Sequence, residues 1–312
     1  MSEKITPVYA GLDVAKRTLQ LHLQNRQHPL PNDPTGQAQL VGLLQAVPGV
    51  HVICEATGGY ERAPVAALHT AALPVSVLNP SQTHAFARAT GQRAKNDPID
   101  AAGLTAYGVA LRPPATPAPA ALDAELAALV RWRNQLVDLR TAAQNQAEHH
   151  VLPFVTTQHA ELLAQLASQL KAVDQELGAL AARHAALQQK VQRLTEIAGV
   201  GQVTALAVLA QMPELGTLSR GAAAALAGLA PWDRQSGPWE GQRHIGGGRA
   251  GVRRALYMPA VAALRCHATL KAFYRRLRDA GKPAKVALTA VMRKLIVLMN
   301  HALKDPSFSL AA

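Results

Sequence analysis

The segment KNDPIDAAGL, residues 95–104, places two carboxylates three positions apart, at Asp97 and Asp100. On a helix this spacing puts both side chains on one face, where like charges repel by about 0.2–0.5 kcal/mol. A solvated helix start would account for the pair, because acidic side chains near a helix N-terminus interact favourably with the helix dipole. A cation bound between the two carboxylates is the other explanation, and it requires further acidic side chains nearby.

Two further carboxylates lie in segments that read as strands. Asp13 stands between Leu12 and Val14, and Glu55 ends the run VHVICE. Either acid alone could point to solvent from a strand end, but a carboxylate in an apolar strand is costly unless it is paired, hydrogen-bonded or metal-bound. Four carboxylates that converge from two strands and a later helix could hold two Mg²⁺ ions, with Mn²⁺ as an alternative. Two such ions stabilise the attacking and leaving oxygens of a phosphoryl transfer.

The charge of the chain is concentrated in its last third. The 312 residues include 32 Lys and Arg against 20 Asp and Glu, a net charge of +12. Residues 197–312 contain 16 Lys and Arg against 5 Asp and Glu, a net of +11, so residues 1–196 carry a net of only +1. This distribution predicts a polyanionic partner for the C-terminal part, with nucleic acid as the leading candidate.

Cysteine content and the N-terminal sequence predict a cytoplasmic protein without a membrane partner. The two cysteines, Cys54 and Cys266, have no paired spacing, which argues against a disulfide framework or a zinc site. The start MSEKITPVYAG does not read as a signal peptide. We also expect no apolar run of membrane-spanning length.

The first 110 residues alternate between strand-like and helix-like patterns, which predicts an α/β layer domain with a mixed sheet. The first two strands are expected to form a hairpin. Strands are predicted at 8–15, 18–24, 50–55 and 73–80, helices at 35–47 and 61–72, and a mostly helical stretch at 81–110.

A proline-rich segment, 112–119, predicts a stiff linker and a domain boundary. Two long helical stretches follow, at about 120–150 and 158–195, and the second carries an apolar heptad stripe with His184 at its one missing position. We favour pairing of this stripe with a second chain as a coiled coil. A helical hairpin within one chain would bury the same stripe and remains open.

The C-terminal region is predicted to be helical over 252–304 and rich in Arg and Lys. The glycine-rich segment HIGGGRAG, 244–251, precedes it and could hold a DNA phosphate at a helix N-terminus, or could be a flexible connector. Solvated basic faces are the alternative to phosphate contacts for each basic cluster. The clusters are Arg253-Arg254, Arg275-Arg276-Arg278 and Arg293-Lys294.

Several motifs together resemble the DEDD transposases of insertion sequences, which are related to the Piv and MooV DNA invertases. The resemblance implies that Asp13, Glu55, Asp97 and Asp100 are the catalytic acids and the metal ligands. The sequence departs from the family pattern at Asn96, and Pro98 stands between the two late acids. The motifs are GLDVAK, EATGGY, the Asn-Pro pair at 79–80, KNDPIDA, AGVG (198–201), LAGLAPWDRQSG (226–237), GQRHIGGGRAGVRRALYMPAV (241–261) and GKPAKVALTAVMRKLIVLMN (281–300).

The resemblance also implies a nucleophilic serine in the C-terminal domain, at Ser236. By local sequence alone Ser236 reads as a turn hydroxyl, because Gly-Pro follows it. A serine hydroxyl needs a base or a metal to become nucleophilic. His244 is one candidate base, although activation by the metal of the acidic domain is the preferred interpretation. The candidate nucleic-acid-binding residues near it are Arg234, Arg243, Arg249, Arg253 and Arg254.

The resemblance implies a RuvC-like, RNase H-type domain at 1–112, a linker and coiled coil at 113–196, and a helical serine-bearing domain at 197–312. It implies cleavage of DNA at element ends and target through a covalent phosphoserine link, followed by rejoining. It further implies target choice by a structured guide RNA encoded by the element, assembly as dimers or tetramers, and a bacterial cytoplasmic protein that associates with the nucleoid when active.

Two other functions stay open at this point. A metal-dependent junction-resolving nuclease would use the acids with water as the nucleophile. A non-enzymatic nucleic-acid scaffold would need only the long helices and the basic C-terminal region.

Overall fold

A computed structural model describes residues 7–92, 96–149, 151–233, 235–236, 239–241 and 243–308. The chain divides into two compact units between Pro119 and Ala120. The finer division predicted from the sequence, at 112 and 196, stays a prediction.

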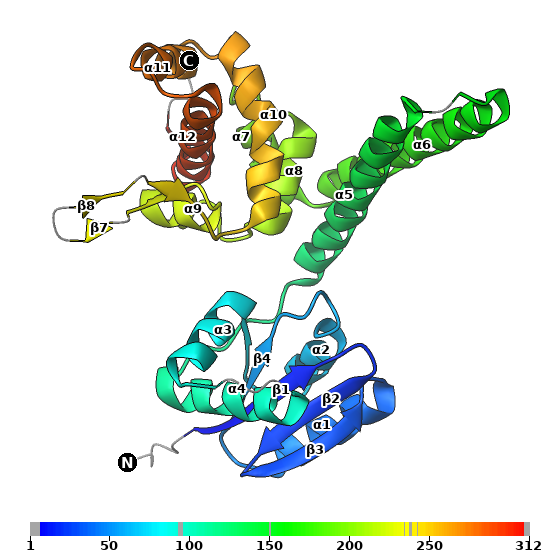
Figure 1. Cartoon of the computed structure of the whole chain (residues 1–312), viewed down its shortest axis with the longest axis vertical. Helices are drawn as coiled ribbons and strands as arrows, with labels where there is room; N and C mark the ends of the chain where they lie inside the picture. Colours follow the sequence, from blue (N-terminus) through cyan, green and yellow to red (C-terminus); the bar gives the residue numbers. More distant parts are fainter. Residues whose placement is uncertain are drawn as a thin grey trace. The chain divides into compact units, whose positions relative to one another are not determined.

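The first unit contains the elements β1 (Val8–Val14), β2 (Thr18–Leu23), β3 (Arg26–Pro31), α1 (Pro34–Gln45), β4 (Val50–Glu55), α2 (Arg62–Thr70), β5 (Val75–Leu78), α3 (Pro80–Ala89) and α4 (Asp97–Leu111). Its sheet has the strand order β3-β2-β1-β4-β5 (Figure 1). The first three strands pair antiparallel, whereas β1, β4 and β5 pair parallel. The predicted α/β layer with a mixed sheet is therefore confirmed.

The strand β3 was not predicted, because its sequence RQHPLP is polar and contains two prolines. Proline lacks the N–H group that a central strand needs, so it occurs in sheets mainly on edge strands. β3 forms the edge of the sheet and pairs only with β2 among the described strands.

The two faces of the sheet pack against different helices, because side chains alternate along each strand (Figure 1). The face toward α1 and α2 forms the larger core of the unit, which includes Ala10, Leu12, Val14, Leu40, Leu44, Val65 and Leu68. The face toward α4 forms a smaller core, which consists of Tyr9, Ile53, Leu78, Leu104 and Tyr107 with Phe86 against it.

The stretch 81–110, which was predicted to be mostly helical, contains two helices, α3 and α4. α4 begins after Asn96, whose side-chain oxygen accepts a hydrogen bond from the backbone N–H of Ile99 at 2.9 Å. Asn is a favourable capping residue, and Pro98 is tolerated in the first turn because its missing N–H is not needed there. The two departures from the family pattern therefore fit the start of a helix, which carries Asp97 and Asp100 in its first turn.

α4 approaches the backbone of β1 very closely at Gly11. A Cβ atom at this position would lie 1.9 Å from the carbonyl oxygen of Ala101 and 2.7 Å from the backbone nitrogen of Thr105. The hydroxyl of Thr105 also lies 2.8 Å from the ring nitrogen Nδ1 of His22, within hydrogen-bond distance. The absence of a side chain at Gly11 thus sets how closely the helix lies on the sheet.

The second unit is mostly helical. α5 and α6 lie side by side as a hairpin, whereas the short strands pair as β6 with β9 and β7 with β8 (Figure 1). The elements are α5 (Ala121–Ala147), α6 (Pro153–Arg183), α7 (Ala185–Thr195), α8 (Gln202–Gln211), α9 (Arg220–Leu226), β6 (Pro231–Trp232), β7 (Gln235–Ser236), β8 (Trp239–Glu240), β9 (His244–Ile245), α10 (Ala250–Cys266), α11 (Ala268–Asp279) and α12 (Ala284–Lys304).

The heptad stripe is buried within one chain, which corrects the preference for two-chain pairing through it. Its members on α6 share a core with residues of α5. The long helix also ends at His184, whose extended backbone separates α6 from α7. His184 is exposed and is not part of a continuous stripe. The buried hydrophobic residues of the hairpin are Leu126, Val130, Leu136, Ala143, Leu166, Leu170, Val173, Leu177, Leu180 and Ala181.

α12 is long and apolar enough by length and composition to cross a membrane, alone among the described helices. The expectation that no run reaches this length is therefore wrong. Half of its apolar window is buried inside the protein. A helix that is apolar on most sides is expected in the core of a large unit, and α12 contributes Val291, Leu295, Ile296 and Met299 to that core.

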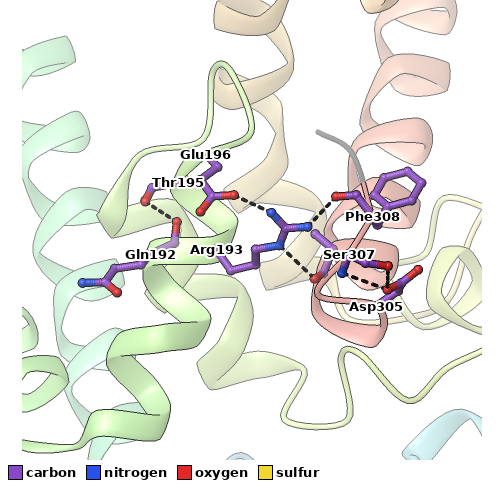
Figure 2. Close-up of polar contacts among 8 residues, drawn as sticks. Gln192, Arg193, Thr195, Glu196, Asp305, Ser307 and Phe308 are labelled. Atoms are coloured by element: carbon purple, nitrogen blue, oxygen red, sulfur yellow. Dashed lines mark hydrogen bonds and ion pairs between the residues drawn. The ribbon is translucent and has the colours of Figure 1, made fainter. Parts of the chain in front are cut away.

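Arg193 on α7 fixes the segment that follows α12 (Figure 2). Its guanidinium donates hydrogen bonds to the carbonyl oxygens of Ala302 (3.3 Å) and Phe308 (2.5 Å) and pairs with Glu196 (2.5 Å). The ring of Phe308 stacks on His301, with 5.7 Å between the centroids. Hydrogen bonds from a charged donor are stronger than neutral ones, so this cluster ties the segment to α7.

We predict that Gly11→Ala destabilises the first unit by at least about 2 kcal/mol, because the added methyl group would overlap the backbone of α4. Urea denaturation of the full chain, followed by circular dichroism, measures the change. Gly42→Ala on α1 is the control, since its Cβ would meet open space; it should stabilise the protein by about 0.5–1 kcal/mol. If Gly11→Ala unfolded with the same urea midpoint as the wild-type protein, the close approach would not be required for stability.

Candidate active site

Asp13 and Glu55 lie at the same level on neighbouring parallel strands. β1 and β4 pair with Leu12 opposite Cys54, so the next residue of each strand is an acid. Ile53, two residues before Glu55, belongs to the core beneath α4. Alternation therefore directs both carboxylates to the face of the sheet that α4 covers.

The first turn of α4 brings two more carboxylates to this edge of the sheet. The close contact between α4 and Gly11 places this turn beside the end of β1. A cavity of about 700 Å³ opens there, and all four predicted acids line it. The lining residues are Asp13, Glu55, Thr57, Thr83, His84, Phe86, Ala87, Arg88, Gln92, Asp97, Asp100, Gly103, Leu104 and Tyr107.

The environment of the cavity raises the pKa of Asp13 from 3.8 to about 6. Partial burial is the largest cause, and the negative charges of Asp97 and Asp100 come next. A backbone hydrogen bond at Val14 opposes the shift, and Glu55 adds a smaller increase. Four carboxylates that were unrelated in space could not produce this coupling.

The donor set of the cavity fits a hard divalent cation. Its acids offer only oxygen atoms, and Mg²⁺ is commonly held by one or two carboxylates while it keeps several waters. Across the described parts of the chain, however, no three His, Cys, Asp or Glu side chains form a ready-made metal-binding group. The carboxylates share a cavity and repel one another, and a cation between them would remove that repulsion.

Two polar side chains that the sequence prediction omitted contact the acids. The hydroxyl of Thr83 donates a hydrogen bond to Oε2 of Glu55 at 2.5 Å, and the amide of Gln92 donates to Oδ1 of Asp100 at 3.4 Å. The Asn-Pro pair was a signal for Thr83, because this pair begins α3 and places Thr83 in the first turns of the helix.

Two basic side chains on α3 also line the cavity, His84 and Arg88. Both are exposed, and neither belongs to an ion pair of the described residues. A site that combines several carboxylates with a free guanidinium suits a phosphate that is bound together with a metal ion.

Ser236 lies in the second unit, where β7 and β8 form a short hairpin with Ser236 opposite Trp239. The structure describes the backbone of Ser236 but not its side chain, and Arg234 lies outside the described residues. His244, the candidate base, is exposed in β9 opposite Trp232. The acids and the serine belong to different units, so their convergence stays a prediction.

Two of the predicted nucleic-acid contacts form exposed ion pairs. Arg243 pairs with Asp233 at 2.5 Å, and Arg254 pairs with Asp138 of α5 at 2.7 Å. Exposed pairs contribute about 0–1 kcal/mol to stability, so either guanidinium could exchange its partner for a phosphate at little cost.

Arg249 and Arg253 fix the glycine-rich segment against its own unit. Arg249 pairs with Glu214 at 2.7 Å and donates to the carbonyl oxygen of Gln211 at 2.6 Å. Arg253 donates to the carbonyl oxygen of Gly247 at 3.2 Å. These contacts argue against a flexible connector, whereas the predicted binding of nucleic acid by the two arginines stays a prediction.

We predict that Asp13 makes the metal-free protein less stable as the pH rises. Its folded-state pKa of about 6 lies above the ordinary 3.8, so its stabilising contribution is complete below 3.8 and is lost as the pH rises through 6. Urea midpoints measured in chelator should fall more for wild type than for Asp13→Asn over this range. His22 and His51, whose pKa values burial lowers, titrate in both chains and cancel. Parallel profiles would contradict the coupling.

Two transposase families match the sequence. The DEDD transposase family of IS110 elements matches residues 10–155, a range that includes all four acids. The transposase IS116/IS110/IS902 family matches residues 191–275, which include Ser236 and the five predicted arginines.

Two relatives match nearly the whole chain. The pilin gene-inverting proteins of Moraxella lacunata and Moraxella bovis are each 28% identical over 319 residues, which covers 96% of this chain and 97% of theirs. The insertion element IS110 uncharacterized 43.6 kDa protein of Streptomyces coelicolor is 34% identical over 149 residues, 46% of this chain and 36% of that protein. The sequence therefore matches both transposase domains of IS110-type elements and is similar over nearly its whole length to the pilin gene-inverting proteins, which implies the activity of a DNA transposase or recombinase.

Proposed function

We propose that the protein is a DNA transposase or site-specific recombinase of an insertion sequence, in which Asp13, Glu55, Asp97 and Asp100 hold Mg²⁺ and Ser236 is the nucleophile. The observation that carries the proposal is the shared cavity of the four acids, together with the coupling that raises the pKa of Asp13. The order of the strands is compatible with the RNase H-like, RuvC-like fold that we propose for this unit.

The cavity supplies the groups that a phosphodiester reaction needs. When bound by the four acids, Mg²⁺ or Mn²⁺ would neutralise charge on the reacting phosphate and favour the ionised form of an attacking oxygen. Thr83 orients the carboxylate of Glu55, and Arg88 and His84 can contact the phosphate oxygens. Preorganised donors of this kind stabilise the charge that develops in the transition state.

In the proposed cleavage step, Oγ of Ser236 forms a bond to phosphorus while the bond from phosphorus to one sugar oxygen breaks. The serine hydroxyl loses its proton and the departing sugar oxygen gains one. Because one phosphodiester replaces another, the step needs no external energy source. The phosphodiester is preserved as a phosphoserine link. Attack of a sugar hydroxyl on that link reverses the chemistry and rejoins DNA with a new partner.

The proposal places the acids and the serine in one composite site that both units contribute to. A single chain could provide both parts, or two chains of a dimer or tetramer could share them. DNA at the element ends and target is the proposed substrate, and an element-encoded structured RNA is the proposed guide in the bacterial cytoplasm. The name of the pilin gene-inverting relatives supports DNA inversion as a related outcome.

A junction-resolving nuclease is the second candidate. It is favoured by the fact that the four acids and their cavity all belong to the first unit, so water could replace the serine. The non-enzymatic scaffold is set aside because both transposase domains match the sequence.

We predict that Ser236→Ala abolishes a covalent protein–DNA adduct on a denaturing gel with DNA of the element end, because no other hydroxyl is proposed to attack phosphorus. Ser168→Ala, which changes an exposed serine of α6, is the matched control and should form the adduct at the wild-type level. Cleavage without an adduct in wild type would establish the nuclease instead. An adduct that persists in Ser236→Ala would exclude this serine as the nucleophile.

We predict that Thr83→Val weakens Mg²⁺ binding by about 10-fold or more, because loss of a hydrogen bond that orients a metal ligand has effects of this size. Isothermal titration with Mg²⁺ measures the affinity. Thr83→Ser keeps the hydroxyl and should retain it. Equal affinity of the valine and wild-type proteins would remove Thr83 from the site.

A further inference from the structure

A second cavity, in the C-terminal unit, has the opposite charge to the first. It lies between the start of α9, α11 and α12 and has a volume of about 610 Å³. Four full positive charges line it, from three helices, and no Asp or Glu of the described residues does so. The lining residues are Arg220, His267, Thr269, Leu270, Phe273, Arg276, Ala290, Arg293, Lys294, Val297, Leu298, His301 and Phe308.

The four cations of this basic cavity are not neutralised within the described chain. Arg220, Arg276, Arg293 and Lys294 are all exposed, and none belongs to an ion pair of the described residues. The same unit pairs several other arginines with carboxylates. Clustered like charges that lack internal partners produce a local potential that attracts an anion.

The fold positions two of these cations before any ligand binds. Nζ of Lys294 lies 4.5 Å from the ring centroid of Phe273, and Cζ of Arg276 lies 5.4 Å from the same centroid. Contacts of a cation with an aromatic ring are attractive and restrict the long side chains. Less conformational freedom is then lost when these groups bind an anion.

Part of the cavity lining is apolar, and beside it lies one buried polar atom that lacks a hydrogen-bond partner among the described residues. Leu270 and Val297 line the cavity beside the buried side chain of His267. Nδ1 of His267 has no hydrogen-bond partner among the described residues. Burial lowers the pKa of His267, so the ring is neutral near pH 7 and can offer a hydrogen bond rather than a charge. A cavity lining that combines exposed cations with apolar side chains suits a phosphate attached to a sugar better than a free, fully hydrated ion.

We propose that this basic cavity binds backbone phosphates of a nucleic-acid strand, with Arg220, Arg276, Arg293 and Lys294 as the contacting groups. The site is distinct from the acidic cavity and from the arginines at 234–254. The proposal rests on the proposed function only for the expectation that nucleic acid is the partner. Phosphodiesters are shared by DNA and RNA, and the experiment separates these two sources.

The test measures how the dissociation constant of the full-length protein depends on salt, for duplex DNA, single-stranded DNA and RNA of equal length. A plot of log affinity against log salt has a negative slope. If each cation contacts one phosphate, the double variant Arg293→Gln/Lys294→Gln should make this slope less steep by about 1.4 on a single strand or about 1.8 on a duplex. Arg220→Gln, on another helix, should make it less steep by about half as much.

The matched control is Lys282→Gln/Lys285→Gln, which removes the same charge near the start of α12 outside the cavity lining. It should keep the wild-type slope, and thermal unfolding should confirm that all variants fold. A reduced slope in the DNA arms alone or in the RNA arm alone supports the proposal and identifies the source. Slopes that stay at the wild-type value in every arm, or that fall equally in the control, overturn it. The Ser236 adduct assay is independent, so failure of the cavity leaves the cleavage mechanism standing.

Discussion

The close approach of α4 to β1 at Gly11 is the constraint on which the acidic site depends. Any larger residue there would meet the backbone of α4, and the helix would have to move away from the sheet. Asp13 is fixed by the register of β1, whereas Asp97 and Asp100 belong to α4. The distance between the strand acid and the helix acids is therefore set by a contact that involves no charged side chain. Backbone packing, rather than attraction between the groups themselves, brings the carboxylates together.

Each of the two units gathers a group of like charges around one cavity. The first unit gathers carboxylates at one edge of its sheet, and the second gathers cations between α9, α11 and α12. Such clusters oppose folding, because net charge of one sign repels itself. Both are partly exposed, so water reduces this penalty. In the proposed function the penalty is removed by ligands of opposite sign, divalent cations at one cavity and phosphates at the other.

The sequence predicts elements well where local pattern decides them, and less well where a distant contact decides them. Apolar strand patterns predicted that Asp13 and Glu55 lie on strands, and Asp33-Pro34 predicted the start of the first helix. The heptad stripe could not reveal its partner, because α5 of the same chain and a second chain would bury it equally. The hydrogen bond from Thr83 to Glu55 and the basic cavity arise from residues far apart in the sequence, so no local pattern predicts either.

The raised pKa of Asp13 has a further consequence for the proposed metal site. A proton and a divalent cation relieve the same repulsion among the four carboxylates, so they compete for one cavity. Above the pKa of about 6 the proton has left, and the repulsion then acts on the contact between α4 and β1. A cation bound by the acids would offset that repulsion and so stabilise the docking of α4 on β1. In the proposed site, metal binding and the docking of α4 would therefore be thermodynamically linked.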